Sequence, residues 1–413
     1  MRNLQAEQPH TTRQQVGHGG TLAALRHRNF RLYFAAQVVS SLGSWVQITV
    51  ENWLVLQLSH SGLALGVTNA LQFGPSVAFG LYGGVIADRC DRRRVLMFTQ
   101  AGMGLLALAV GVLAGLGVVR VWMIWIAAGA FGLIKCFDLP AQQSFVKDLV
   151  GTGDLANAVA LTNLVSAIGR TVGPVFGGLL LASLGIATGF VSNAATFALV
   201  VAMLLWLDPT KLAPRARVPR ASGQIQQGLL YVVSKPDLVM TAVVMFAVFT
   251  AAYNFQIALA LIASRNLTGG GQLYGILMSA LGLGVVTGSL ASARRARTGV
   301  TVILLWTTAL AVTQLAVAAA HSITLLLPTV FAYGLSAGLF SVTVINSLQS
   351  QTAETMRGRV MAVYAVAFLG SSLVGGPAFG ALAEWIGISG AMDVAACICA
   401  IVALGAAAAQ LFR

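Results

Sequence analysis

Apolar runs of about 20 residues follow one another along most of the chain, separated by short polar segments. A helix rises about 1.5 Å per residue, so each run can cross the roughly 30 Å hydrocarbon core of a bilayer. Helices are expected because lipid offers the backbone no hydrogen-bond partner. The pattern predicts twelve spans, at residues 33–58, 63–87, 95–117, 121–140, 156–182, 186–207, 237–263, 272–293, 299–319, 323–347, 360–386 and 389–411.

Composition supports this interpretation. Of the 413 residues, 57% are hydrophobic and only 9% are charged, whereas soluble domains carry roughly 25% charged residues. These values exclude a disordered chain, a disulfide scaffold and an ordinary soluble enzyme. The first thirty residues are polar and basic without an apolar core, so we expect no signal peptide there. The predicted fold class is an all-α membrane protein.

The positions of the basic residues predict the topology. The net charge of +13 would suggest nucleic acid binding in a soluble protein. Here the 25 Lys and Arg residues are dispersed between spans, and all but three lie in the N-terminal tail, in alternate loops or at the C-terminus. The exceptions are Arg120, Arg265 and the intramembrane Arg170. This bias predicts twelve spans with both termini in the cytoplasm, and no nucleic acid partner.

The chain divides into two similar halves. We expect an N-terminal tail at 1–31, a six-helix half at 32–207, a cytoplasmic linker at 208–236 and a second six-helix half at 237–413. The linker is rich in proline and basic residues, and its apolar residues at 225, 229, 230 and 233 predict a short helix on the inner membrane surface. The sequence at 173–177 is similar to that at 376–380. Such repeats are typical of secondary transporters, which bind substrate between two halves.

The segment after the second predicted span combines carboxylates with several cations, over residues 84–94. One interpretation is a basic loop that only sets the topology. The spacing resembles the Gly-x-x-x-Asp-Arg-x-Gly-Arg-Arg signature of the major facilitator superfamily, whose Asp and first Arg form a cytoplasmic latch between the halves. The resemblance assigns the latch to Asp88 and Arg89, and Asp91 stands where the family has its second Gly. The other matching positions are Gly84, Arg92 and Arg93.

The fifth predicted span carries a glycine pattern at four-residue spacing. Gly169, Gly173 and Gly177 form one smooth helix face for close approach of a neighbouring helix. Pro174 lacks an N–H, so a bend is expected there. Together with Gly178, these residues resemble the superfamily's antiporter motif, Gly-x-x-x-Gly-Pro-x-x-Gly-Gly, which implies a proton-coupled exporter.

Further runs are similar to one bacterial branch of this superfamily, the secretion effectors, which include enterobactin-type siderophore exporters and macrolide efflux proteins. These runs lie at 28–31, 70–73, 88–96 and 157–161. The resemblance implies twelve helices in two pseudo-symmetric halves that alternate access to a central site. Many proton-coupled exporters carry an intramembrane Arg in span four, and residues 121–134 contain none.

Ionisable residues inside spans are functional candidates, because they are energetically expensive there. Glu51 lies in the first span, and Gln47 shares its helix face. An apolar cavity favours the neutral form of a carboxylate, so Glu51 could take up and release a proton. The alternatives are a carboxylate paired with a fixed cation and one solvated at the outer surface.

Three more residues are candidates for substrate or proton binding. Arg170 could pair with Glu51, hold an anionic substrate or bind carbonyls freed near Pro174. Asn254 and Gln256 lie in the seventh span, which is pseudo-equivalent to the first, so they are expected to face the same cavity. Because they are two positions apart, only one can be central.

The sequence contains no set of residues typical of an enzyme active site, no spacing typical of metal ligands and no phosphate-binding loop. We therefore predict no cofactor, no metal site and no ATP hydrolysis. The predicted function is export of a small amphiphilic molecule, such as a drug or siderophore-like metabolite, across the bacterial cytoplasmic membrane in exchange for protons, by a monomer. A proton symporter or facilitator on the same fold is the first alternative. A non-transporting membrane sensor or scaffold is the second.

Overall fold

The computed structural model describes residues 22–212, 224–265, 270–295, 298–354 and 356–411, with the side chains of 81–88, 182, 224–226, 228, 265, 295, 362 and 369 excepted. The first six long helices are α1 Arg28–Ser59, α2 Gly62–Arg89, α3 Arg92–Gly115, α4 Val121–Val150, α5 Leu155–Ser183 and α6 Ile186–Trp206. The remaining helices are α7 Gln224–Val233, α8 Pro236–Ala252, α9 Phe255–Arg265, α10 Gly270–Arg295, α11 Val300–Ala318, α12 Ile323–Gln351, α13 Arg357–Trp385 and α14 Gly387–Leu411.

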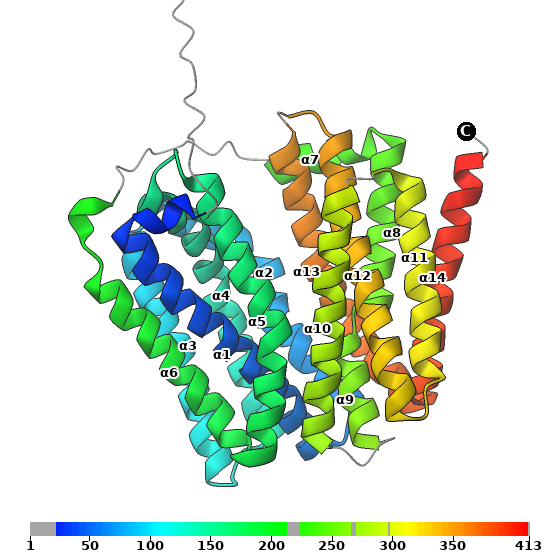
Figure 1. Ribbon diagram of the computed structural model, residues 1–413, viewed down its shortest axis with the longest axis horizontal. Coiled ribbons are helices and arrows are strands. Elements are labelled where there is room, and N and C mark those ends of the chain that lie inside the picture. Colours follow the sequence, from blue (N-terminus) through cyan, green and yellow to red (C-terminus); the bar gives the residue numbers. More distant parts are fainter. Residues whose placement is uncertain (1–21, 213–223, 266–269, 296–297, 355, 412–413) are drawn as a thin grey trace, which may run out of the picture.

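The helices form two bundles side by side, α1–α6 and α8–α14 (Figure 1). Within the described part of the chain, ten spans are long and apolar enough to cross a membrane: α3 to α6, the α8–α9 pair, and α10 to α14. Helices α1 and α2 complete the twelve, at 32 and 28 residues. Helix α1 is less apolar because it carries polar residues such as Gln47, Glu51 and Asn52, and all three are buried against neighbouring helices. The fold is therefore the predicted all-helical membrane bundle of two six-span halves.

The seventh span is not the single helix predicted at 237–263. Helix α8 ends at Ala252, helix α9 begins at Phe255, and Tyr253 and Asn254 between them are not helical. No Gly or Pro marks this break in the sequence. Discontinuous spans are characteristic of transporter binding sites, because the interrupted backbone exposes polar groups at mid-membrane.

Helix α7 is the short helix predicted in the linker. Its apolar side chains Leu229, Leu230 and Val233 are exposed, as an interfacial helix requires. It contacts α8 and α13 at the end of the molecule where α1 begins and α14 ends (Figure 1). We call this end the linker face and the other end the opposite face.

The two halves touch close to the opposite face. Helix α2 meets α13 so tightly that a Cβ on Gly66 would lie 2.3 Å from the carbonyl oxygen of Gly376. Helix α5 meets α10 where a Cβ on Gly178 would lie 2.8 Å from Cα of Gly275. Hydrogen bonds also join the halves there, including Asn52 Nδ2 to the Tyr274 hydroxyl at 3.3 Å. The halves are thus closed against each other on the side away from α7.

Candidate functional site

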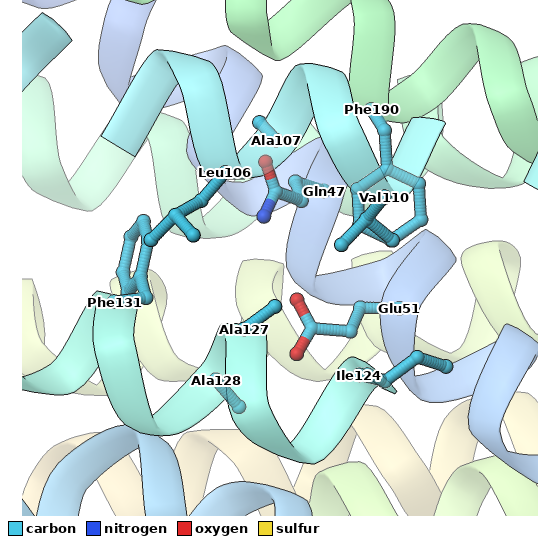
Figure 2. A pocket seen from close by; sticks show the side chains of 10 residues that line it. All are labelled: Gln47, Glu51, Leu106, Ala107, Val110, Ile124, Ala127, Ala128, Phe131 and Phe190. Atoms are coloured by element: carbon cyan, nitrogen blue, oxygen red, sulfur yellow. The ribbon is translucent and has the colours of Figure 1, made fainter. Parts of the chain in front are cut away.

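Glu51 lies inside the first half, in a small cavity enclosed by α1, α3, α4 and α6 (Figure 2). Its side chain is 6% exposed. Apart from Gln47, the lining is apolar, from Leu106, Ala107, Val110, Ile124, Ala127, Ala128, Phe131 and Phe190. The cavity leaves about 10 Å³ for the centre of a water molecule, which is room for about one water. This carboxylate is buried, in a cavity lined by residues of the first half.

A buried amide pair holds Gln47 beside Glu51. Asn193 Nδ2 in α6 donates to Gln47 Oε1 at 2.7 Å, and Thr196 Oγ1 donates to Asn193 Oδ1 at 2.9 Å. No cation among the described residues lies within ion-pair distance of Glu51. The structure therefore presents a carboxylate flanked by a fixed amide and room for about one water.

Arg170 does not join Glu51. Its guanidinium carbon lies 5.5 Å from the ring centre of Trp45 in α1. It also interacts electrostatically with Tyr253 and Tyr364, which belong to the second half. The side chain of Arg170 is exposed. Arg170 and Glu51 thus occupy separate sites on different sides of α1.

Asn254 lies at the break in span seven and serves the backbone there. Its Nδ2 donates to the carbonyl oxygens of Thr250 at 2.7 Å and Ala251 at 3.4 Å. The hydroxyl of Tyr333 donates to the carbonyl oxygen of Ala252. These donors replace the helical N–H groups that the break removes. Gln256 is half-buried and makes no hydrogen bond to the described residues. The structure does not bring either residue to Glu51.

A cluster of aromatic side chains on the second half surrounds Tyr253, and the sequence analysis did not single it out. Phe249 makes edge contacts with Tyr253, Tyr364 and Phe368, at ring-centre distances of 4.7, 6.1 and 4.8 Å. Tyr364 and Phe368 are stacked at 6.2 Å. The two residues lie four apart in α13, which is the one signal in the sequence that could have found them.

The glycine pattern of α5 packs against α1 as its spacing predicts. Cβ atoms built on Gly169, Gly173 and Gly177 would meet Ser41, Trp45 and Thr49, at 2.2, 2.4 and 2.9 Å. Both sets recur every four residues, so one smooth face lies along the other. Gly178 points instead to α10 in the second half. Helix α5 continues through Pro174.

The basic motif is described only in part, because the side chains of Gly84 and Asp88 lie outside the described residues. Arg89 is exposed. Arg92 Nη1 forms a salt bridge with Asp148 Oδ1 in α4 at 2.7 Å. Arg93 donates to the carbonyl oxygens of Leu204 and Leu205 at the end of α6, at 2.7 and 2.9 Å.

Asp91 has a structural role in this motif. Its carboxylate accepts from the backbone N–H groups of Arg93 at 2.9 Å and Arg94 at 3.4 Å. This contact caps the N-terminus of α3, where an acidic residue is favourable. The replacement of the family's second glycine therefore leaves an ordered start to the helix.

Two further carboxylates have interactions that the sequence analysis did not find. Asp138 is fully buried, accepts from Thr99, Gln100 and Gln142, and forms a salt bridge with Lys135 at 3.6 Å. Glu384 in α13 accepts from the Ser61 hydroxyl and from the backbone N–H of Leu63 at 3.1 Å. It therefore links the second half to the start of α2, at the opposite face. No group of three potential metal ligands occurs among the described residues.

Comparison with known proteins identifies similar chains. The profile of the transmembrane secretion effector family matches residues 19–412. The MFS-type transporter YfiS of Bacillus subtilis is 26% identical over 90% of both chains. The enterobactin exporter EntS of Escherichia coli O1:K1 is 26% identical over 85% of both chains. A bacterial homologue of the lysosomal transporter Spinster, in an inward-facing and unoccupied conformation, superposes with a TM-score of 0.73 at 13% identity, covering 91% of this chain and 96% of that chain.

Proposed function

Because this chain belongs to the transmembrane secretion effector family of major facilitator transporters, we propose that it exports a small amphiphilic molecule in exchange for protons. The cargo class is a drug or a siderophore-like metabolite, and the membrane is the bacterial cytoplasmic membrane. The similarity to an enterobactin exporter supports export. The antiporter-like motif at Gly169–Gly178 supports exchange rather than uptake.

The observation that carries the proposal is the site of Glu51. A carboxylate that is buried among apolar side chains, without a cation partner, is stable there when protonated. A water molecule in the adjoining space would give the proton a route to and from it. The fixed Gln47 amide can hydrogen-bond either protonation state. Glu51 can therefore bind a proton in one conformation and release it in the other.

The charge distribution supports the direction assigned to this conformation. The basic segments that include Arg89, Arg92 and Arg93 lie at the linker face, which the positive-inside rule assigns to the cytoplasm. With the halves closed at the opposite face, the structure then corresponds to a state open to the cytoplasm. The cargo would enter in this state and leave after the halves rock about their contact.

Proton exchange can be measured in everted membrane vesicles from an efflux-deficient bacterium that expresses the chain. Amphiphilic dyes and antibiotics are added to respiring vesicles while an acridine dye reports the internal pH. We expect a cargo to release luminal protons with the wild type and with the exposed control Glu354→Gln, and not with Glu51→Gln at equal membrane levels.

Other results would change the proposal in specific ways. Proton release that persists in Glu51→Gln would remove Glu51 from the coupling step. Cargo leaving the lumen together with protons would favour the symporter. Cargo movement without any pH change would favour the facilitator. A wild-type chain that moves no compound of the panel would favour the membrane sensor.

A further inference from the structure

Arg170 is a cation at mid-membrane without a carboxylate partner. The described acidic side chains give it no salt bridge within 4 Å, and the groups that interact with its charge are the tyrosines 253 and 364. Among the described residues, the buried acids of the same half are Glu51, Asp138 and Asp148, and each has surroundings of its own: the cavity, the polar side chains of α3 and α4, and Arg92. A cation within the spans is costly unless an anion compensates it. The structure therefore leaves the counter-charge of Arg170 to be supplied from outside the protein.

The groups around Arg170 are aromatic and only partly buried. Trp45 from the first half and Tyr253 and Tyr364 from the second are intermediate in exposure, and so is Phe368, which stacks on Tyr364. Each therefore keeps ring surface available for a ligand. Tyr253 is fixed by hydrogen bonds from its hydroxyl to the Ala337 carbonyl at 2.7 Å and with Ser341 Oγ at 2.6 Å. Tyr364 and Phe368 are stacked, and Phe249 makes edge contacts with both.

These side chains come from both halves. Arg170 and Trp45 lie together in the first half, and the aromatic side chains at the break in span seven belong to the second, where Tyr253 and Tyr364 interact with the charge of Arg170. Residue 170 belongs to α5 and Trp45 to α1, whereas Tyr253 lies between α8 and α9 and Tyr364 lies in α13. A ligand that touches all of them would contact both moving bodies at once. This is the position from which a bound molecule biases the rocking of one half against the other.

We propose that the Arg170 cluster, made of Arg170, Trp45, Tyr253, Tyr364 and Phe368, binds an organic anion that carries a planar aromatic body. The guanidinium forms charge-assisted hydrogen bonds with the carboxylate, sulfonate or phenolate of the ligand. The aromatic body lies against Tyr364 and Phe368, where aromatic contacts add to area burial. The inference names the cargo class of the proposed exporter and rests on that function. Glu51 binds and releases the proton at a separate site.

Three probes with one aromatic body and different charges test the assignment. Naphthoate, naphthylmethanol and naphthylmethylammonium are equilibrated by dialysis with the full chain in lipid nanodiscs, and binding to empty nanodiscs is subtracted. Because a charge-assisted hydrogen bond contributes about 1.5–3 kcal/mol, naphthoate should bind at least about tenfold more tightly than the alcohol. The ammonium probe should bind most weakly.

Variants assign the preference to individual residues. Arg170→Gln should remove the advantage of naphthoate and leave the alcohol unchanged, and Arg170→Lys should keep part of it. Tyr364→Leu should weaken the anion and the alcohol together, because both use the ring surface. Arg120→Gln, an equal change of charge at the exposed start of α4, should change neither. Thermal unfolding of each variant confirms that it is folded.

Equal affinity for anion and alcohol, preference for the cation, naphthoate binding weaker than about 1 mM, or full naphthoate binding by Arg170→Gln would each overturn the proposal. Dialysis requires no transport, so the two proposals fail separately. If naphthoate binds through Arg170 but vesicles show no proton exchange, the proposal of proton-coupled export is rejected and the anion site is retained. Proton exchange without an effect of Arg170 would do the reverse.

Discussion

At the scale of single residues, the buried polar side chains of the first half divide into those that carry charge and those that position it. Glu51 is the ionisable group of the cavity, and Gln47 lies beside it. Gln47 is held in turn by Asn193, which is 1% exposed and donates to it at 2.7 Å. In an apolar interior an unpaired amide is unfavourable, so this pair fixes the geometry around Glu51.

Replacing Asn193 by leucine, a side chain of similar size, should leave Gln47 Oε1 without its donor. We expect the free energy of unfolding to fall by about 1 kcal/mol, the magnitude typical of interhelical hydrogen bonds in membranes. Thermal unfolding of the purified protein in one detergent measures the change. Thr308→Val is the control, because the Thr308 hydroxyl bonds only to a carbonyl within its own helix. Equal midpoints for wild type and Asn193→Leu would show that the amide pair adds no stability.

At the scale of elements, the break in span seven is stabilised by side chains that stand in for the lost helical bonds. Asn254 Nδ2 donates hydrogen bonds to the carbonyl oxygens of Thr250 and Ala251, and the Tyr333 hydroxyl donates to that of Ala252. The broken span also positions Tyr253 in the Arg170 cluster. The integrity of the break therefore affects both stability and the candidate cargo site.

Asn254→Ala should lower the unfolding midpoint, because two carbonyl oxygens lose their hydrogen-bond donor at a cost of about 1 kcal/mol. It should also weaken naphthoate binding, because Tyr253 is then held less firmly. Gln256→Ala is its matched control, since Gln256 is polar, lies two residues away and makes no hydrogen bond to the described residues. Equilibrium dialysis measures naphthoate binding and thermal unfolding measures the midpoint for each of the two variants. A larger effect from Gln256→Ala would reverse the assignment of the central polar residue of this span.

The contact between α1 and α5 is set by glycine. A Cβ at Gly173 would lie 2.4 Å from Cβ of Trp45 and 3.1 Å from the Leu42 carbonyl oxygen, so α1 and α5 would have to separate. Gly173→Ala should therefore reduce the amount of folded protein in the membrane, as measured by size-exclusion chromatography of a fluorescent fusion. Gly129→Ala, in the middle of α4 with nothing within 4 Å, should fold as well as the wild type. If both variants fold equally well, the packing of α1 on α5 is looser than the structure indicates.

The helical spans and the glycine face of α5 could be predicted from the sequence. Span length and the four-residue spacing of Gly169, Gly173 and Gly177 are local patterns, and both describe the observed helices well. The break at Tyr253 lacks a local signal, because no Gly or Pro occurs there and the donors that stabilise it come partly from α12. The separation of Arg170 from Glu51 depends on which face of α1 meets α5, and the sequence of either helix alone does not determine this.

At the scale of the whole molecule, the halves are held together near the opposite face by close backbone contact and a few hydrogen bonds. Glu384 of α13 accepts from Ser61 and Leu63 at the start of α2. The sequence gives no signal for these contacts, because Glu384 lies more than 300 residues from its partners in the chain. These contacts have to break when the transporter opens toward that face, so they set the balance between its two states.

Gly66 offers a way to shift that balance without disturbing either half. A Cβ there would meet only backbone atoms of the second half, namely the carbonyl of Gly376 and the nitrogen of Pro377, at 2.3 to 2.6 Å. Backbone atoms cannot move aside as side chains do, so Gly66→Ala should destabilise the closed contact by about 1–3 kcal/mol. This corresponds to a shift of the two-state equilibrium of about fivefold or more.

Spin labels on Leu184→Cys and Trp385→Cys, exposed positions at the opposite face in different halves, report the shift as a longer distance in pulsed electron resonance. The four native cysteines are replaced first. Gly80→Ala is the control in the same helix, because nothing lies within 4 Å of its Cβ, and it should leave the distance unchanged. Unlike Gly173→Ala, which acts within one half, Gly66→Ala should change the distance at constant unfolding midpoint. An unchanged distance in folded Gly66→Ala would mean that the α2–α13 contact does not control opening.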